Sequence, residues 1–151
     1  MGAARLLRWA AVRAGLVRPT PAEAERLLGR AGERAAARLL RRAGYCILGR
    51  NVRVRIGEAD IVCLAPDRRT IVLVEVKTRR APEATSGATW LPPEASVHRR
   101  KQAKLISVLR YLARANGWTS RPLRIDVIGV EWPARGKPVL RHHVGAVTSA
   151  R

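Results

Sequence analysis

Hydrophobic residues recur at helical spacing in the segment "PAEAERLLGRAGERAAARLLRRAGY", which predicts an amphipathic helix. Thr20 precedes this segment and can cap a helix whose first position is Pro21, because a threonine side chain accepts from free backbone N–H groups. Gly44 is a typical stop signal. The positions expected to face the core are Leu27, Leu28, Ala31, Ala35, Leu39 and Leu40.

A second helical pattern covers "EASVHRRKQAKLISVLRYLARANG", residues 94–117, with Asn116-Gly117 as its stop. Its expected core positions are Val97, Leu105, Val108, Leu109 and Leu112. Between this helix and the preceding strand lies the segment 79–96, which is rich in Pro, Ala, Ser and Gly. A connection of this length predicts a functional or mobile segment.

Five further segments have the composition of strands: "YCILGRNVRVR", "GEADIVCLA", "TIVLVEVKT", "LRIDVIGVEW" and "PVLRHHVGAV". The order helix, three strands, helix, two strands predicts an α/β (α+β) fold, with a five-stranded mixed sheet flanked by helices. We expect one domain over residues 21–151, preceded by a basic N-terminal extension over residues 1–20.

The charge of the chain is strongly positive, with 30 Lys and Arg against 11 Asp and Glu and a formal net charge of +19. Such an excess indicates a polyanionic partner: DNA, RNA or an anionic membrane surface. The alternative is a solvated basic surface without a specific partner. No apolar run reaches the ~20 residues of a membrane span, and Cys46 and Cys63 have the apolar surroundings of small buried residues. We therefore expect a cytoplasmic protein.

The apolar run Ile71–Val76 of the strongest predicted strand contains Glu75 near its end and is followed by Lys77, although an unpaired buried charge costs several kcal/mol. If Ala65 and Thr70 close a four-residue loop, the hairpin register places Asp60 directly opposite Glu75. Side chains alternate along a strand. The same face of the hairpin therefore carries the residues two positions away, Lys77 and Glu58.

Two opposed carboxylates repel each other, so a positive charge is expected between Asp60 and Glu75. Lys77 can supply part of it, and Mg²⁺ or Mn²⁺ can supply the rest with the backbone carbonyl of Val76 as a further ligand. Only four of the 30 basic residues are Lys, which favours a role for the compact ammonium group of Lys77. The alternative is an exposed strand end where Glu75 and Lys77 pair with each other.

The combination of "GEADIVCLA" with "TIVLVEVKTR" resembles the signature of the YraN-like family, bacterial proteins with the PD-(D/E)XK endonuclease-like fold. The flanking segments "GERAAARLLRRAGYCILGRNVR", "VHRRKQAKLISVLRYLA" and "LRIDVIGV" fit the same family in the same order. The resemblance covers residues 24–131 and implies a restriction-endonuclease-like core, similar to that of Holliday-junction resolvases. It implies that Asp60 and Glu75 are metal ligands, that Lys77 is the catalytic lysine, and that Glu33 is an additional helix acid. The alternative for Glu33 is a solvent-facing helix position.

The resemblance predicts a metal-dependent endonuclease that hydrolyses DNA, which is favoured over RNA, and selects branched or single-stranded structures. Basic residues near the site are expected to contact phosphates: Arg79, Arg80, Arg99, Arg100, Lys101 and Lys104. Trp90 is a candidate for stacking on a base or for anchoring its loop. Cutting two strands would favour a homodimer. The alternatives are a non-catalytic nucleic-acid-binding protein of the same fold, and an RNA-binding accessory protein whose acidic residues are structural.

Overall fold

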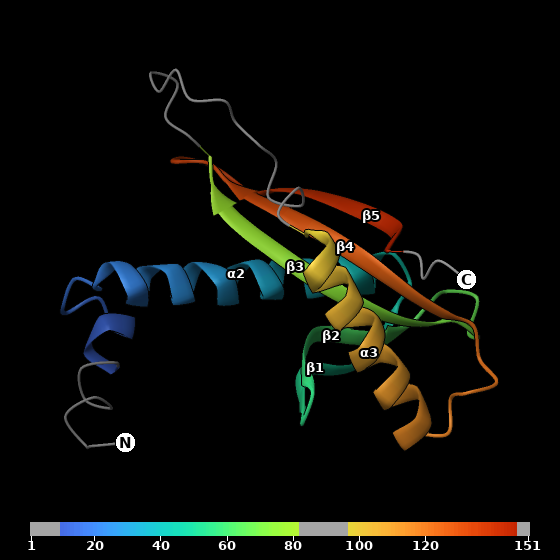
Figure 1. Ribbon diagram of the computed structural model, residues 1–151. Coiled ribbons are helices and arrows are strands. Elements are labelled where there is room, and N and C mark those ends of the chain that lie inside the picture. Colours follow the sequence, from blue (N-terminus) through green and yellow to red (C-terminus); the bar gives the residue numbers. More distant parts are fainter. Residues whose placement is uncertain (1–9, 82–96, 148–151) are drawn as a thin grey trace.

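The computed structural model describes residues 10–81 and 97–147 (Figure 1). Its elements are α2 (Pro21–Arg42), β1 (Cys46–Val54), β2 (Gly57–Leu64), β3 (Ile71–Arg80), α3 (Arg99–Ala115), β4 (Leu123–Trp132) and β5 (Val139–Val147). The strands form one sheet in the order β1-β2-β3-β4-β5, in which β3 and β4 are parallel and the other neighbours antiparallel. The predicted α/β class and five-stranded mixed sheet are confirmed.

Helices α2 and α3 cover opposite faces of the sheet, with α3 in front and α2 behind in Figure 1. Side chains alternate along each strand, so the central strands supply apolar residues to both layers. The core beneath α3 contains Val62, Leu73, Leu105, Val108, Leu109, Leu112, Ile125 and Val127. The core beneath α2 contains Ala36, Ala37, Leu40, Ile61, Val72, Val74, Ile128 and Val130. This double cover places the middle of β3 between two apolar layers.

The ends of α2 are those expected from its sequence. Thr20 is the N-cap, and its side chain and that of Glu23 form a reciprocal capping box, with Pro21 in the first turn. The chain leaves the helix through Gly44, whose φ of +85° is a conformation that glycine adopts without strain. The predicted start and stop of this helix are confirmed.

Gly32 lies in the middle of α2 although glycine has a low helix propensity, and its packing against β3 explains why. It is buried against β3, and a Cβ atom at this position would lie only 1.8 Å from Thr78 Oγ1. Glycine therefore allows the helix backbone to approach the strand closely. This close approach also positions the next residue, Glu33, near the end of the β2–β3 hairpin.

The boundaries around the long connection differ from the expected ones. β3 continues through Arg79 and Arg80, because its parallel pairing with β4 extends to Arg80 opposite Trp132. The helix expected from residue 94 begins at Arg99, with His98 as its N-cap. Residues 82–96, and with them Trp90, lie outside the described residues.

Two further expectations concern cysteines and membranes. Cys63 is buried as predicted, but Cys46 is exposed at the start of edge strand β1, so its predicted burial is wrong. Within residues 10–81 and 97–147, no helix combines the length and apolar character needed to cross a bilayer.

Candidate active site

The β2–β3 hairpin opens into a fork at Asp60 and Glu75. Backbone pairing joins Ile61–Leu64 to Ile71–Val74 in the register predicted from the sequence, and Ala65 donates to Thr70 across the loop. The pairing stops one position before the two acids. The prediction that Asp60 and Glu75 form a directly opposed pair assumed an unbroken hairpin and is therefore wrong. Instead, Asp60 Oδ2 accepts a 2.8 Å hydrogen bond from the Val76 N–H. The Asp60 side chain thus replaces a backbone partner where the strands separate.

The environment of Asp60 raises its pKa from 3.8 to about 6. Burial is the main cause, because it disfavours the charged carboxylate, and the negative charges of Glu75 and Glu33 act in the same direction. The hydrogen bond from Val76 and the positive charge of Lys101 oppose the rise without cancelling it. Asp60 therefore lies where an additional cation would be stabilised.

Glu75 is the most buried acid of the fork, with 2% of its surface exposed. Its Oε1 atom lies 2.9 Å from Lys77 Nζ and 3.0 Å from Lys101 Nζ. Its Oε2 atom is buried and has no hydrogen-bond partner among the described residues. A buried carboxylate oxygen without a partner is costly, unless a ligand binds to it. The expectation that Lys77 shares a face with Glu75 is confirmed.

Lys101 has a position that the sequence prediction missed. It was expected to contact phosphates, but the structure places it, from the first turn of α3, against Glu75. His98 supports this turn, because its Nδ1 atom accepts from the Lys101 N–H at 3.3 Å. The scarcity of lysine in the chain, which drew attention to Lys77, is the signal that could have found Lys101 as well.

Glu33 lies at the edge of the fork on the α2 side. Its Oε2 atom accepts a 2.9 Å hydrogen bond from Asn51 Nδ2 on β1, and its charge contributes to the raised pKa of Asp60. Glu33 is therefore neither a direct partner of Asp60 nor a purely solvent-facing residue. The Gly32 contact with β3 holds it in place.

The other predicted site residues lie further out. Glu58 forms a 3.5 Å ion pair with Arg53 on the neighbouring strand, and 61% of its side chain is exposed, so the structure does not bring it to Glu75. The remaining predicted phosphate-binding residues are exposed on β3 and α3: Arg79, Arg80, Arg99, Arg100 and Lys104. They stay candidates for nucleic-acid contacts at the periphery of the site.

The fork offers few protein ligands to a metal ion. Among the described residues, no group of three or more His, Cys, Asp and Glu side chains is arranged to hold one. The available donors are the carboxylates of Asp60 and Glu75 and the carbonyl of Val76, which points to the same side of β3 as its N–H. Mg²⁺ prefers oxygen ligands and retains several waters, so this small set fits it. The unpartnered Glu75 Oε2 supports the same fit.

A second buried charge cluster lies on β4 and was not predicted. Asp126 is fully buried and binds Arg124 through both oxygens, at 2.8 and 3.0 Å. It also contacts His142 Nε2 at 2.9 Å and accepts from the Gly145 N–H at 2.9 Å. Arg124 in turn donates to the hydroxyl of Tyr45. His142, on β5, is thus part of this cluster.

The cluster stabilises the charged form of Asp126. Burial alone would raise the pKa of Asp126, but hydrogen bonds from His142, Arg124 and Gly145 together lower the pKa below its ordinary value. Burial and the charge of Asp126 raise the pKa of the neighbouring Cys63 thiol to about 12. The cluster is a closed network, because both carboxylate oxygens of Asp126 have partners.

Comparisons with known proteins place the chain in a family. The model of the uncharacterised protein family UPF0102 matches residues 32–130. A UPF0102 protein of Streptomyces griseus is 42% identical over 118 residues, covering 78% of this chain and 93% of that protein. The UPF0102 protein STH1475 of Symbiobacterium thermophilum is 44% identical over 107 residues, covering 70% and 83%. Among solved structures, Pyrococcus furiosus SfsA in complex with Ca²⁺ is similar with a TM-score of 0.36 and 16% identity, covering 80% of this chain and 64% of that one.

Proposed function

The chain belongs to the UPF0102 family, the YraN family that its sequence resembles, and we propose that it is a metal-dependent endonuclease acting on DNA. The observation that carries the proposal is the state of Glu75. This buried carboxylate has two lysines on one oxygen and no partner on the other, at the point where the β2–β3 hairpin opens. A purely structural carboxylate would have partners for both oxygens.

Asp60, Glu75 and the Val76 carbonyl would hold Mg²⁺ or Mn²⁺. When bound, such an ion polarises a phosphate and lowers the pKa of a bound water. The chain's own contribution would come from two ammonium groups. Lys77 and Lys101 lie within 3.0 Å of Glu75 Oε1, so they are positioned to orient the attacking water and to stabilise the negative charge that develops on the phosphate.

Several properties of the reaction follow from the charge and the resemblance. The net charge of +19 supports a nucleic-acid substrate, with DNA favoured over RNA and branched or single-stranded DNA favoured over plain duplex. A homodimer would place one site at each of the two DNA strands, so that both could be cut. Cytoplasmic localisation and the division into a basic extension and one endonuclease-like domain remain predictions.

The alternative is a nucleic-acid-binding protein of the same fold without catalysis. The ion pairs of Glu75 with Lys77 and Lys101 favour this alternative, because they partly neutralise the acid without a metal. However, carboxylates repel a phosphate backbone, so a protein that only binds DNA gains nothing from a raised-pKa aspartate and a buried glutamate in an open fork.

The test is cleavage of labelled single-stranded, duplex, flap and four-way-junction DNA with Mn²⁺, Mg²⁺ or EDTA. The wild type would be compared with Glu75→Ala and with Glu131→Ala, a control acid on β4 that pairs with Arg141. We expect metal-dependent cutting that Glu75→Ala abolishes and Glu131→Ala retains. Binding without cutting in every reaction, by wild type and variants alike, would favour the alternative.

A further inference from the structure

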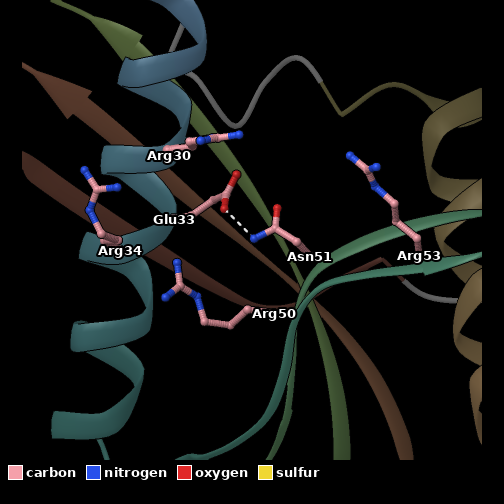
Figure 2. A pocket seen from close by; sticks show the side chains of 6 residues that line it. All are labelled: Arg30, Glu33, Arg34, Arg50, Asn51 and Arg53. Carbon is pink, nitrogen blue, oxygen red and sulfur yellow. Dashed lines mark hydrogen bonds between the residues drawn. The ribbon is translucent and has the colours of Figure 1, made fainter. Parts of the chain in front are cut away.

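An open pocket of about 530 Å³ lies between α2 and β1, beside the fork (Figure 2). Figure 2 shows side chains reaching into it from both elements, with Glu33 and Asn51 meeting through their hydrogen bond. Its lining residues are Arg30, Glu33, Arg34, Arg50, Asn51 and Arg53. Four guanidinium groups thus surround one carboxylate, and none of the residues expected from the sequence to bind phosphate contributes to the lining.

The lining indicates an anionic ligand. Pockets for small organic molecules are lined mainly by apolar and aromatic side chains, whereas every lining residue here is charged or an amide. Arginine presents a planar fork of donors that matches the oxygens of a phosphate group. Within the described part of the chain, Arg34 and Arg50 form no ion pair, whereas Arg53 contacts Glu58. The charges of Arg34 and Arg50 are therefore available to a ligand.

The pocket adjoins the fork through Asn51. β1 and β2 pair through Arg50 with Ile61 and through Val52 with Ala59, which leaves Asn51 opposite Asp60. Neighbouring strands lie ~4.8 Å apart, so the pocket is one strand away from the carboxylate that would hold the metal. Asn51 adopts a φ of +51°, which asparagine tolerates better than most residues. This conformation accompanies its hydrogen bond to Glu33 at the pocket wall.

We infer that this pocket binds a backbone phosphate of the DNA strand that is cut, close to the phosphodiester at the fork. The inference rests on the proposed nuclease function, because the position of the cut strand is defined by Asp60 and Glu75. The pocket lies on the α2 side of the fork, and the exposed basic residues at the start of α3 lie on the other side. A strand held on both sides would present one phosphate to the fork.

The experiment measures DNA binding without cleavage, by fluorescence anisotropy of a labelled single strand in EDTA between about 50 and 200 mM salt. The pocket variant is Arg34→Gln/Arg50→Gln. The control is Arg110→Gln/Arg114→Gln, which removes the same charge from exposed positions on α3. We expect the pocket variant to bind about tenfold more weakly than the control. Its slope of log K against log salt should be about 0.7 smaller than that of the wild type, since one single-strand phosphate contact contributes ~0.7.

A charge-preserving variant, Arg34→Lys/Arg50→Lys, separates geometry from charge and serves if the Gln variant does not fold. The inference expects intermediate affinity, because lysine keeps the charge and loses the planar fork. Equal binding by the pocket and control variants, or by the Lys variant and the wild type, would overturn it. Inorganic phosphate that binds the pocket while the DNA affinity does not depend on Arg34 and Arg50 would also overturn it, and would indicate a small-anion site.

The outcomes keep the inference and the proposed function apart. A wild type that cuts DNA, with a pocket variant no weaker than the control, would contradict the pocket and leave the nuclease intact. DNA binding that depends on the pocket, in a wild type that never cuts, would support the pocket and contradict the nuclease. A wild type that does not bind DNA would overturn both.

Discussion

Glu75 and Asp126 are two buried carboxylates on neighbouring central strands, with 2% and 0% of their surfaces exposed. β3 and β4 pair in parallel with Val74 beside Asp126, so the two acids are offset by one position and point to opposite faces of the sheet. Asp126 has partners for both oxygens: Arg124, His142 and the Gly145 N–H. Glu75 shares one oxygen between two lysines and leaves the other unpartnered.

The difference shows that burial alone does not identify a functional carboxylate. A buried charge with a complete set of partners contributes to a defined structure, and removing it leaves the partners unpaired. A buried charge with an incomplete set is destabilising by itself and becomes favourable when a ligand completes it. The first description fits Asp126 and the second fits Glu75.

The largest expected effect separates the two acids by stability. Asp126→Asn should lower the free energy of unfolding by about 3 kcal/mol, because the half-buried Arg124 loses the charged partner that is itself fully buried. The matched Glu75→Gln should change it by less than about 1 kcal/mol, or increase it, because an incompletely paired charge is removed. Urea unfolding followed by circular dichroism at neutral pH measures both. Equal losses in the two variants would show that Glu75 is as structural as Asp126.

The second prediction concerns the lysines of α3. Lys101→Met should reduce metal-dependent cleavage by roughly 10- to 100-fold, since Lys101 contacts Glu75 and can stabilise charge on the phosphate. Lys104→Met is the control: it lies three residues further along α3, is exposed, and forms no ion pair among the described residues. Initial cleavage rates under saturating metal provide the comparison. Similar losses in both variants would indicate a general effect of charge on DNA binding.

The third prediction tests whether a metal ion is the missing partner of the Glu75 carboxylate. Mn²⁺ at ten times its Kd should stabilise the wild type by about 1.4 kcal/mol, because it binds only the folded state. We expect a millimolar-range site, so the measurement is a thermal melt over a Mn²⁺ titration with Mg²⁺ in parallel. Asp60→Ala and Glu75→Gln should abolish the shift, whereas Glu131→Ala should retain it. A shift that persists in Asp60→Ala would place the metal elsewhere.

The smallest expected effect is a pH dependence of stability at the fork. The pKa of Asp60 is raised to about 6 in the folded protein, so the folded state favours the protonated form. Its contribution to stability is therefore present below pH ~4 and is lost as the pH rises through about 6. Asp60→Asn should be more stable than the wild type by on the order of 1 kcal/mol at pH 8, and this advantage should vanish near pH 4.

Urea unfolding of the wild type and Asp60→Asn at several pH values measures this difference, in the presence of EDTA. Asn keeps an oxygen that can accept from the Val76 N–H, so the variant tests the charge alone. An advantage that does not change between pH 4 and pH 8 would contradict the raised pKa of Asp60.

The sequence by itself determined most of the secondary structure and the register of the hairpin. Local signals were sufficient for α2, because Thr20, Pro21 and Gly44 act through their own backbone conformations and nearby N–H groups. The pairing of β2 with β3 followed from one loop length, and the placement of Lys77 beside Glu75 followed from the alternation of side chains. These features depend on residues that are close in the chain.

Tertiary structure alone decided which distant residues reach each acid. Lys101 reaches Glu75 from α3, and His142 and the Gly145 N–H reach Asp126 from β5. The hairpin also opens at Asp60, because beyond this point β3 stays paired with β4 while β2 stays paired with β1. Such contacts depend on how helices and strands pack in three dimensions. A pattern of residue types along the chain contains propensities and periods but not these distances, so the partners of each buried charge had to come from the structure.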